Sequence, residues 1–156
     1  MIRKYINPWI CNSFIDSCAF DPKYAPEDTA ANDIFEIHND EQLGIMIAHS
    51  TQKEIQHPNT PDWVKTEAAG LIYTIETSLT PNQIAIRTRI HETLTGNGKP
   101  ENYASDATHI FEAQNQGSYF VTTDSRILKL AKELQDICGI NIMLPSDFLE
   151  LVRNNQ

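Results

Sequence analysis

The stretch of sequence that decides the fold is residues 117–124, GSYFVTTD, where a glycine precedes an apolar run and an aspartate follows it. Aromatic and β-branched residues fill most of 119–122, which favours a short strand buried in a sheet. Apolar residues recur at helical spacing over 103–113 before this stretch and over 127–134 after it. The sequence therefore predicts a strand between two helices.

The same alternation of strand and helix extends to the rest of the chain. The continuous apolar run at 43–48 and the largely apolar stretches at 10–15 and 140–144 predict further strands, and the patterns at 30–39 and 145–152 predict helices. Glycine or proline stands at several of the joins, where such residues commonly end an element. This order favours an α/β fold, in which helices cover both faces of a largely parallel sheet.

The pattern in the middle of the chain is less regular. Pro61 opens a helical pattern that continues to Ile75. Within this pattern, Trp63, Leu71 and Ile75 are expected to lie in the core. Residues 81–95 place isoleucines between polar residues, which fits both a strand and one face of a helix, so the sequence leaves this choice open.

Length and composition restrict the class of protein. The chain has 156 residues, a formal net charge of −9 and 40% hydrophobic residues, which suits a single domain spanning 1–156. Such acidity excludes a basic protein that coats nucleic acid, but not a protein with one local contact to it. No apolar segment follows Arg3 and Lys4 as in a secretory signal, and no apolar run reaches the ~18 residues of a membrane helix. We therefore expect a cytoplasmic protein without a membrane contact.

Four carboxylates occupy positions at which α/β proteins bind ligands. Asp16 and Asp124 directly follow predicted strands, and Glu54 lies in the first helical turn after another. Asp106 lies near the semi-buried face of its helix, where an ionised carboxylate is costly unless something compensates it. Ligands bind beyond the carboxyl ends of parallel strands, and acids that converge there repel one another unless a divalent cation joins them. Carboxylate oxygens favour Mg²⁺ or Mn²⁺, which makes these acids a candidate metal site.

Each carboxylate also has a purely structural interpretation. Thr51 and Glu54 match a capping box at a helix start. Asp124 fits the N-cap of the following helix, and Asp16 fits a turn at the end of a strand.

Two side chains of the 103–113 helix are open to both interpretations. Asp106 fits a hydrogen bond to a neighbouring loop as well as a metal site. His109 follows Asp106 by one turn on nearly the same face, and we expect a half-buried histidine bonded to a carbonyl rather than a catalytic group.

Taken together, these segments resemble the PIN-domain nucleases over roughly residues 10–152. The resemblance is carried by segments that contain or flank the acids: FIDS at 14–17, STQKEI at 50–55, SDA at 105–107, FVTTDS at 120–125 and IMLPSDFL at 142–149. It implies a three-layer α/β/α sandwich of the PIN type.

The resemblance also implies a function and its residues. It suggests a metal-dependent endoribonuclease that hydrolyses RNA phosphodiester bonds with Mg²⁺ or Mn²⁺. Thr122 and Ser125 would assist the metal site. The acids that would bind the metal and carry the catalysis are Asp16, Glu54, Asp106 and Asp124. Toxin-like members of the family commonly act as homodimers with an inhibitor, so a homodimer and an antitoxin protein are implied as partners.

Because the chain is acidic overall, we expect its RNA contacts to be concentrated at few cations. Arg126, Lys129 and Lys132 recur every third residue after the last acid, and Arg87 and Arg89 form a second group. We assign substrate binding to Arg126 and Lys129, with a solvated helix face as the alternative.

Two other classes of function compete with the nuclease. A catalytically silent PIN-like module would bind RNA or a protein without cutting. A phospho-acceptor domain needs adjacent acids after the first strand and a lysine after the last. This chain has Asp16-Ser17 and Leu144-Pro145 at those places, which excludes the phospho-acceptor.

Overall fold

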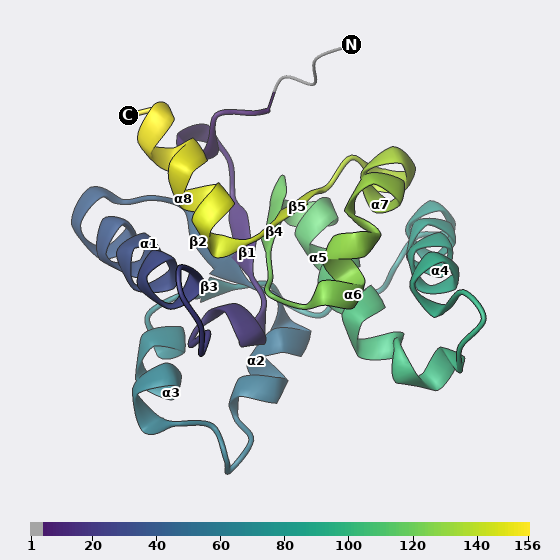
Figure 1. Ribbon diagram of the computed structural model, residues 1–156. Coiled ribbons are helices and arrows are strands. Elements are labelled where there is room, and N and C mark those ends of the chain that lie inside the picture. The colour runs from purple at the N-terminus through teal and green to yellow at the C-terminus, as the bar shows by residue number, and fades with distance from the viewer. Residues whose placement is uncertain (1–4) are drawn as a thin grey trace.

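The computed structural model describes residues 5–156, so residues 1–4 of the predicted domain, with Arg3 and Lys4, lie outside the described part. Its centre is a parallel sheet of five strands in the order β3-β2-β1-β4-β5 (Figure 1). The strands are β1 (Ser13–Ile15), β2 (Ile45–Ile47), β3 (Ile72–Tyr73), β4 (Tyr119–Val121) and β5 (Asn141–Met143).

Helices connect the strands and cover both faces of the sheet. They are α1 (Glu27–Glu41), α2 (His49–Ile55), α3 (Asp62–Ala69), α4 (Pro81–Thr95), α5 (Ala104–Gln116), α6 (Ser125–Lys129), α7 (Ala131–Cys138) and α8 (Pro145–Asn154). Short 3-10 turns lie at Pro8–Ile10, Ser17–Ala19 and Pro100–Asn102. The predicted α/β class and the three-layer α/β/α arrangement around a parallel sheet are confirmed.

The alternation of side chains along the strands divides the core in two. Phe14 and Phe120 are partners across β1 and β4, and both pack with α4, α5 and α7 on one face. Their neighbours Ile15 and Val121 point to the opposite face and pack with α1, α3 and α8. This follows from the two-residue period of a strand. The central strands β1 and β4 are therefore buried on both sides, which fits their largely apolar sequence.

The helix predicted from Pro61 to Ile75 is too long. Helix α3 ends at Ala69 with Gly70 as its C-cap, and the chain turns into the edge strand β3. Leu71 is buried as predicted, but Trp63 is 47% exposed and Ile75 is 80% exposed, so their predicted place in the core is wrong. The β-branched and aromatic residues after Gly70 pair with β2, which outweighs an apolar spacing that also fits a helix.

Helix α4 decides the choice that the sequence leaves open over 81–95, and α6 and α7 differ from the single helix that the sequence predicts. Residues 81–95 form helix α4, which begins with a capping box between Thr80 and Gln83. The helix predicted over 127–134 is two helices, α6 and α7, which meet at Leu130. Both helices present apolar side chains to the same core, so the helical spacing continues across the break.

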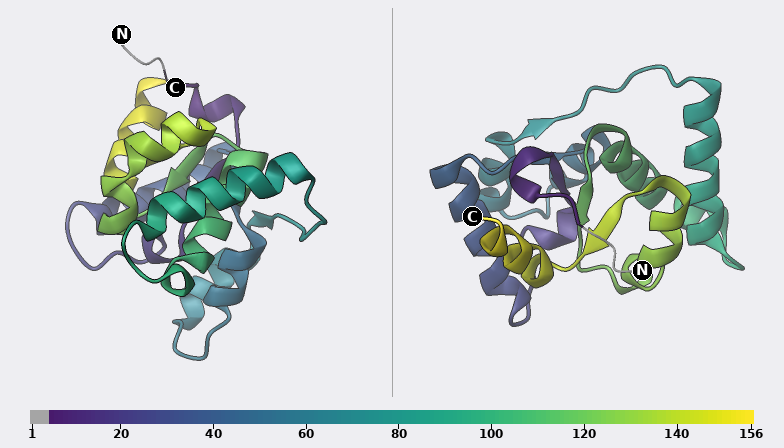
Figure 2. Two further views of the ribbon diagram at one scale, coloured as in Figure 1. Left: turned by 90° about the vertical axis from the view of Figure 1, so that its right-hand side faces the viewer. Right: turned by 90° about the horizontal axis from the view of Figure 1, so that it is seen from above.

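The segment between β3 and α4 crosses the molecule from the edge of the sheet to its outer helix, as Figure 2 shows in the view from above. Helix α4 then packs along α5 and α7. Among the described residues, no helix combines the length and apolar character that a membrane crossing requires.

Candidate metal centre

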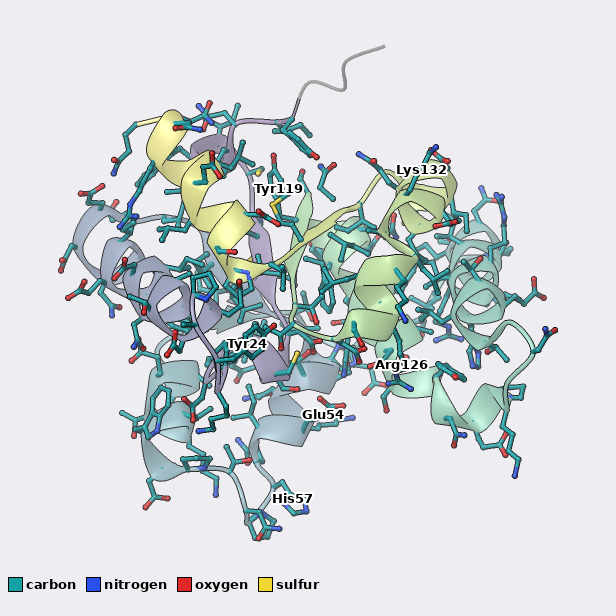
Figure 3. All side chains as sticks on the ribbon, in the orientation of Figure 1. Tyr24, Glu54, His57, Tyr119, Arg126 and Lys132 are labelled. Atoms are coloured by element: carbon teal, nitrogen blue, oxygen red, sulfur yellow. The ribbon has the colours of Figure 1, made fainter. Side chains whose placement is uncertain are left out.

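The topology of the sheet brings the four predicted acids together. Strands β1 and β4 are parallel neighbours with Ile15 opposite Val121, so Asp16 and Asp124 leave the sheet at the same edge. Helix α2 carries Glu54 from the end of β2 on the other side of β1. Asp106 lies in the first turn of α5, which runs back toward the start of β4. Figure 3 shows Glu54, from α2, and Arg126, from α6, in the lower half of the view, above His57.

Asp16 is the most buried of the four acids, with 5% of its surface exposed. Its carboxylate accepts hydrogen bonds from the hydroxyl of Thr122 at 2.7 Å, the backbone N–H of Ser17 at 2.9 Å and the thiol of Cys18 at 3.4 Å. Burial raises the pKa of Asp16, although the bond from Thr122 acts in the opposite direction. The site therefore holds a desolvated carboxylate that is fixed in orientation and short of positive charge.

Glu54 is held at both of its carboxylate oxygens. The hydroxyl of Ser17 donates to Oε2 at 2.9 Å, and Nε2 of His109 lies 2.9 Å from Oε1. The hydrogen bond from His109 lowers the pKa of Glu54, against the opposing effect of burial. Glu54 is thus an ionised carboxylate whose orientation is set from two other elements.

His109 is buried, with 1% of its surface exposed, and both ring nitrogens have partners. Nδ1 lies 2.6 Å from Oγ of Ser50, and Nε2 bonds Glu54. Burial alone would lower the pKa of His109, but the hydrogen bond and charge of Glu54, with the charges of Asp16 and Asp106, raise it. The predicted bond to a carbonyl is wrong, because α2 and α5 pack closely enough for side chains of α2 to take both nitrogens.

Asp106 and Asp124 share one cation. A single guanidinium nitrogen of Arg126, Nη2, lies 3.4 Å from Asp106 and 3.3 Å from Asp124. Burial raises the pKa of Asp106 to about 6, and the charges of Asp16 and Asp124 add to the effect. The charges of Asp16 and Asp124 thus act on Asp106, as the sequence predicts for acids that converge at one edge of the sheet.

The donor set fits a divalent cation. One ligand atom from each of Asp16, Glu54 and His109 lies within 4.8 Å of the others. The predicted ligands Asp106 and Asp124 are not members of this group, although Asp106 is near enough for the charge of Asp16 to raise its pKa. Carboxylate oxygens are the ligands that Mg²⁺ and Mn²⁺ prefer. The imidazole nitrogen nearest this group already bonds Glu54, so we assign His109 to holding Glu54 rather than to the metal.

Two of the structural interpretations of the acids are confirmed, and the capping box is not. Asp124 caps α6 through the backbone N–H of Arg126, and Asp16 accepts from the N–H of the following turn, so both acids have capping roles in addition to their place in the cluster. The capping box at Thr51 is wrong. Helix α2 begins at His49, so Thr51 lies inside the helix, with its hydroxyl buried and without a hydrogen-bond partner.

The predicted supporting residues are placed differently from one another. Thr122 bonds Asp16 directly and also accepts the backbone N–H of Asp124 at 3.1 Å, so it joins two of the acids. Ser125 is exposed at the first residue of α6 and, within residues 5–156, makes no side-chain hydrogen bond to the acids. Lys129 is exposed at the end of the same helix.

No family model, curated protein or solved structure matches this chain. The assignment of a function therefore depends on the chemistry of the site.

Sequence reasoning missed the network that holds Glu54, which consists of Ser17, Ser50 and His109. The signal for His109 was present, because it lies one helical turn after Asp106 on nearly the same face. The two serines gave no such signal. Their role depends on how α2 packs against α5 and against the turn after β1, which a single sequence does not specify.

Proposed function

We propose that this chain is a metal-dependent endoribonuclease that hydrolyses RNA phosphodiester bonds, in the manner of the PIN-domain nucleases that its sequence resembles. The observation that carries the proposal is the group formed by Asp16, Glu54 and His109, whose ligand atoms lie within 4.8 Å of one another at the carboxyl edge of the sheet. Asp106 interacts electrostatically with Asp16 and His109 of this group, and Asp124 interacts with Asp106.

The chemistry of the reaction follows from this arrangement. When bound, Mg²⁺ or Mn²⁺ would acidify a water for attack on phosphorus and offset the charge of the leaving oxygen. Asp16 and Glu54 would hold the ion, since Thr122, Ser17 and His109 fix their carboxylates in advance. Preorganised groups of this kind act without rearranging during the reaction.

Substrate binding requires cations near the acids. Arg126 lies at the site and Lys129 is exposed on the same helix, and we assign both to contacts with RNA phosphates. The resemblance extends the proposal to a cytoplasmic toxin that acts as a homodimer and is held by an antitoxin protein. Copurification of a small protein encoded beside it, and the mass of the particle in solution, test that extension.

The experiment is an RNA degradation assay with Mg²⁺ or Mn²⁺ against EDTA. We compare the wild type with Asp16→Asn and with the double variant Asp106→Asn/Asp124→Asn. Groups that offset developing charge typically contribute about 10²–10³-fold to turnover, and we expect losses of that order. Asp33→Asn is the matched control, because Asp33 pairs with Arg153 away from the site.

Two outcomes would end the proposal. One is a wild type that cuts no RNA with either metal, and the other is a double variant that cuts as well as the wild type. RNA that is bound but not cut would instead favour the catalytically silent module. Arg126 already offsets charge on two of the acids, which is the observation that favours this second candidate.

A further inference from the structure

The two halves of the acidic site differ in the cations that they already hold. On the Asp106 and Asp124 half, Nη2 of Arg126 lies within 3.4 Å of a carboxylate oxygen of each acid. A guanidinium keeps its charge at any pH at which a protein is folded. This half therefore contains a permanent positive charge that belongs to the chain itself.

Arg126 is held in this position from three directions. The backbone N–H of Arg126 donates to Oδ1 of Asp124 at 2.9 Å, and the guanidinium of Arg126 donates to Oδ2. Both oxygens of this carboxylate are therefore bonded to one residue. The guanidinium also lies 5.3 Å from the ring centre of Tyr103, which precedes α5. The cap, the ion pairs and the cation–π contact favour the same placement.

The Asp16 and Glu54 half holds no permanent cation among the described residues, although the ring of His109 forms an ion pair with Glu54 when it is protonated. Within residues 5–156, no lysine or arginine pairs with either carboxylate. Asp16 accepts from a hydroxyl, a thiol and a backbone N–H, and Glu54 from a hydroxyl and a histidine ring. These groups orient the oxygens, and within residues 5–156 Asp16 has no ion-pair partner, so its charge is left for an ion from solution.

We propose that the site takes one divalent cation, on the Asp16 and Glu54 half, and that Arg126 is the resident cation of the Asp106 and Asp124 half. The inference rests on the proposed metal site, and it fixes the number of ions that the site binds. A second divalent ion on the Asp106 and Asp124 oxygens would lie close to the guanidinium and be repelled by it. Arg126 would then supply, as a fixed charge, what a second ion supplies in a two-metal site.

The inference is tested by the number of ions bound, which does not depend on activity. Isothermal titration calorimetry of the full chain with Mn²⁺ should give one equivalent for the wild type. Arg126→Gln should bind a second equivalent, because two carboxylates are released. Arg126→Lys keeps the charge and should bind one. Lys132→Gln removes an exposed cation of α7 that, within residues 5–156, makes no hydrogen bond or ion pair with the acids, and this variant should also bind one.

Acid variants assign the ion to one half. Asp16→Asn should lose the single equivalent, whereas Asp106→Asn should retain it. Arg126 is 55% exposed at its side chain, so its variants should keep the fold, which circular dichroism checks. If Arg126→Gln still proves unfolded, Asp16→Asn and Asp106→Asn decide the question alone.

The outcomes separate this inference from the proposed function. Two equivalents in the wild type, or one in a folded Arg126→Gln, would overturn the inference and leave the nuclease proposal standing. One equivalent in the wild type and two in Arg126→Gln, without RNA cleavage in any metal, would support the inference and remove the nuclease. Absence of metal binding in every variant would remove both.

Discussion

At the scale of single residues, the site shows one side chain orienting another. Glu54 has its orientation set by Ser17 and His109, and His109 is in turn held by Ser50. Partners of metal-binding carboxylates typically change metal affinity by about 10–100-fold when they are removed, although they do not touch the ion. His109 is therefore a positioning residue of the proposed centre.

The first prediction concerns this residue. Replacing His109 by Gln removes the ring that orients Glu54 and should weaken Mn²⁺ binding about 10–100-fold, measured by calorimetry. His91→Gln is the matched control, because His91 bonds the carbonyl of Pro100 on the exposed side of α4. Equal affinity in the His109 variant and the wild type would show that Glu54 does not need this partner.

The second prediction concerns the pH dependence of stability. The pKa of Asp106 is raised to about 6, chiefly by burial, with Asp16 and Asp124 adding to it. The folded state therefore binds this proton more tightly than the unfolded state, and stability falls as pH rises from about 4 to about 6. Above pH 6 the ionised group costs about 1–2 kcal/mol, since partial exposure screens part of the effect.

Asp106→Asn removes this cost. In EDTA, the variant should be about 1–2 kcal/mol more stable than the wild type at pH 7 and nearly equal to it at pH 4, measured by urea unfolding. Asp33→Asn, which changes a half-buried acid that pairs with Arg153 away from the site, should show no such gain in stability. A variant that is less stable than the wild type at pH 7 would contradict the assignment.

At the scale of elements, α2 and α5 are joined by two acid–histidine pairs of opposite sense. Glu54 of α2 pairs with His109 of α5, and Glu112 of α5 pairs with His49 of α2. Glu112 also accepts the hydroxyl of Thr74 and the backbone N–H of His49. Because the N-cap Ala48 has no side chain that could cap α2, Glu112 of α5 and the hydroxyl of Thr74 together accept the first backbone N–H of this helix.

The third prediction tests this joint. Glu112→Ala removes the carboxylate that accepts the backbone N–H of His49 and pairs with its ring, and leaves only the hydroxyl of Thr74 beside both groups. Hydrogen bonds to charged groups contribute about 1.5–3 kcal/mol each. We expect the free energy of unfolding to fall by about 2–3 kcal/mol, measured with urea. Glu101→Ala, at an exposed 3-10 turn, is the control. A loss no larger than that of the control would assign the anchoring of α2 to its apolar contacts.

The strands and helices also show which parts of the fold and of the site a single sequence predicts. The strands around Phe14 and Phe120 were predictable because they are buried on both faces and their sequence is largely apolar. The edge strand β3 was not, since its exposed residues are ordered by pairing with β2 rather than by burial. Of the site, the acids that follow strands were predictable from topology. The partners of Glu54 were not, since they depend on the packing of α2.

At the scale of the whole molecule, a net charge of −9 opposes any polyanion. RNA binding must then depend on few cations, so its salt dependence should be shallow. Each phosphate contact on a single strand adds about 0.7 to the slope of log affinity against log salt concentration. Arg126 and Lys129 are the cations of α6, the helix that Asp124 caps.

The fourth prediction follows from this relation. Lys129→Gln should lower the slope for binding of a single-stranded RNA by about 0.7 and weaken binding at low salt, measured by fluorescence anisotropy in Ca²⁺ to slow cleavage. Lys23→Gln removes one positive charge from an exposed residue paired with Asp21 and should leave the slope unchanged. An unchanged slope in the Lys129 variant would assign this lysine to a solvated face only.

Asp16 and Asp124 cap the backbone turns after their strands and also belong to the acids of the proposed site. These two roles have a consequence for how the protein could change during evolution. Asparagine caps a helix about as well as aspartate, but it brings no charge to attract an ion. A lineage could exchange either aspartate for asparagine in a single step and keep its architecture. Inactive descendants of such a protein should therefore be common, and they should differ from active ones at these two positions rather than in the core.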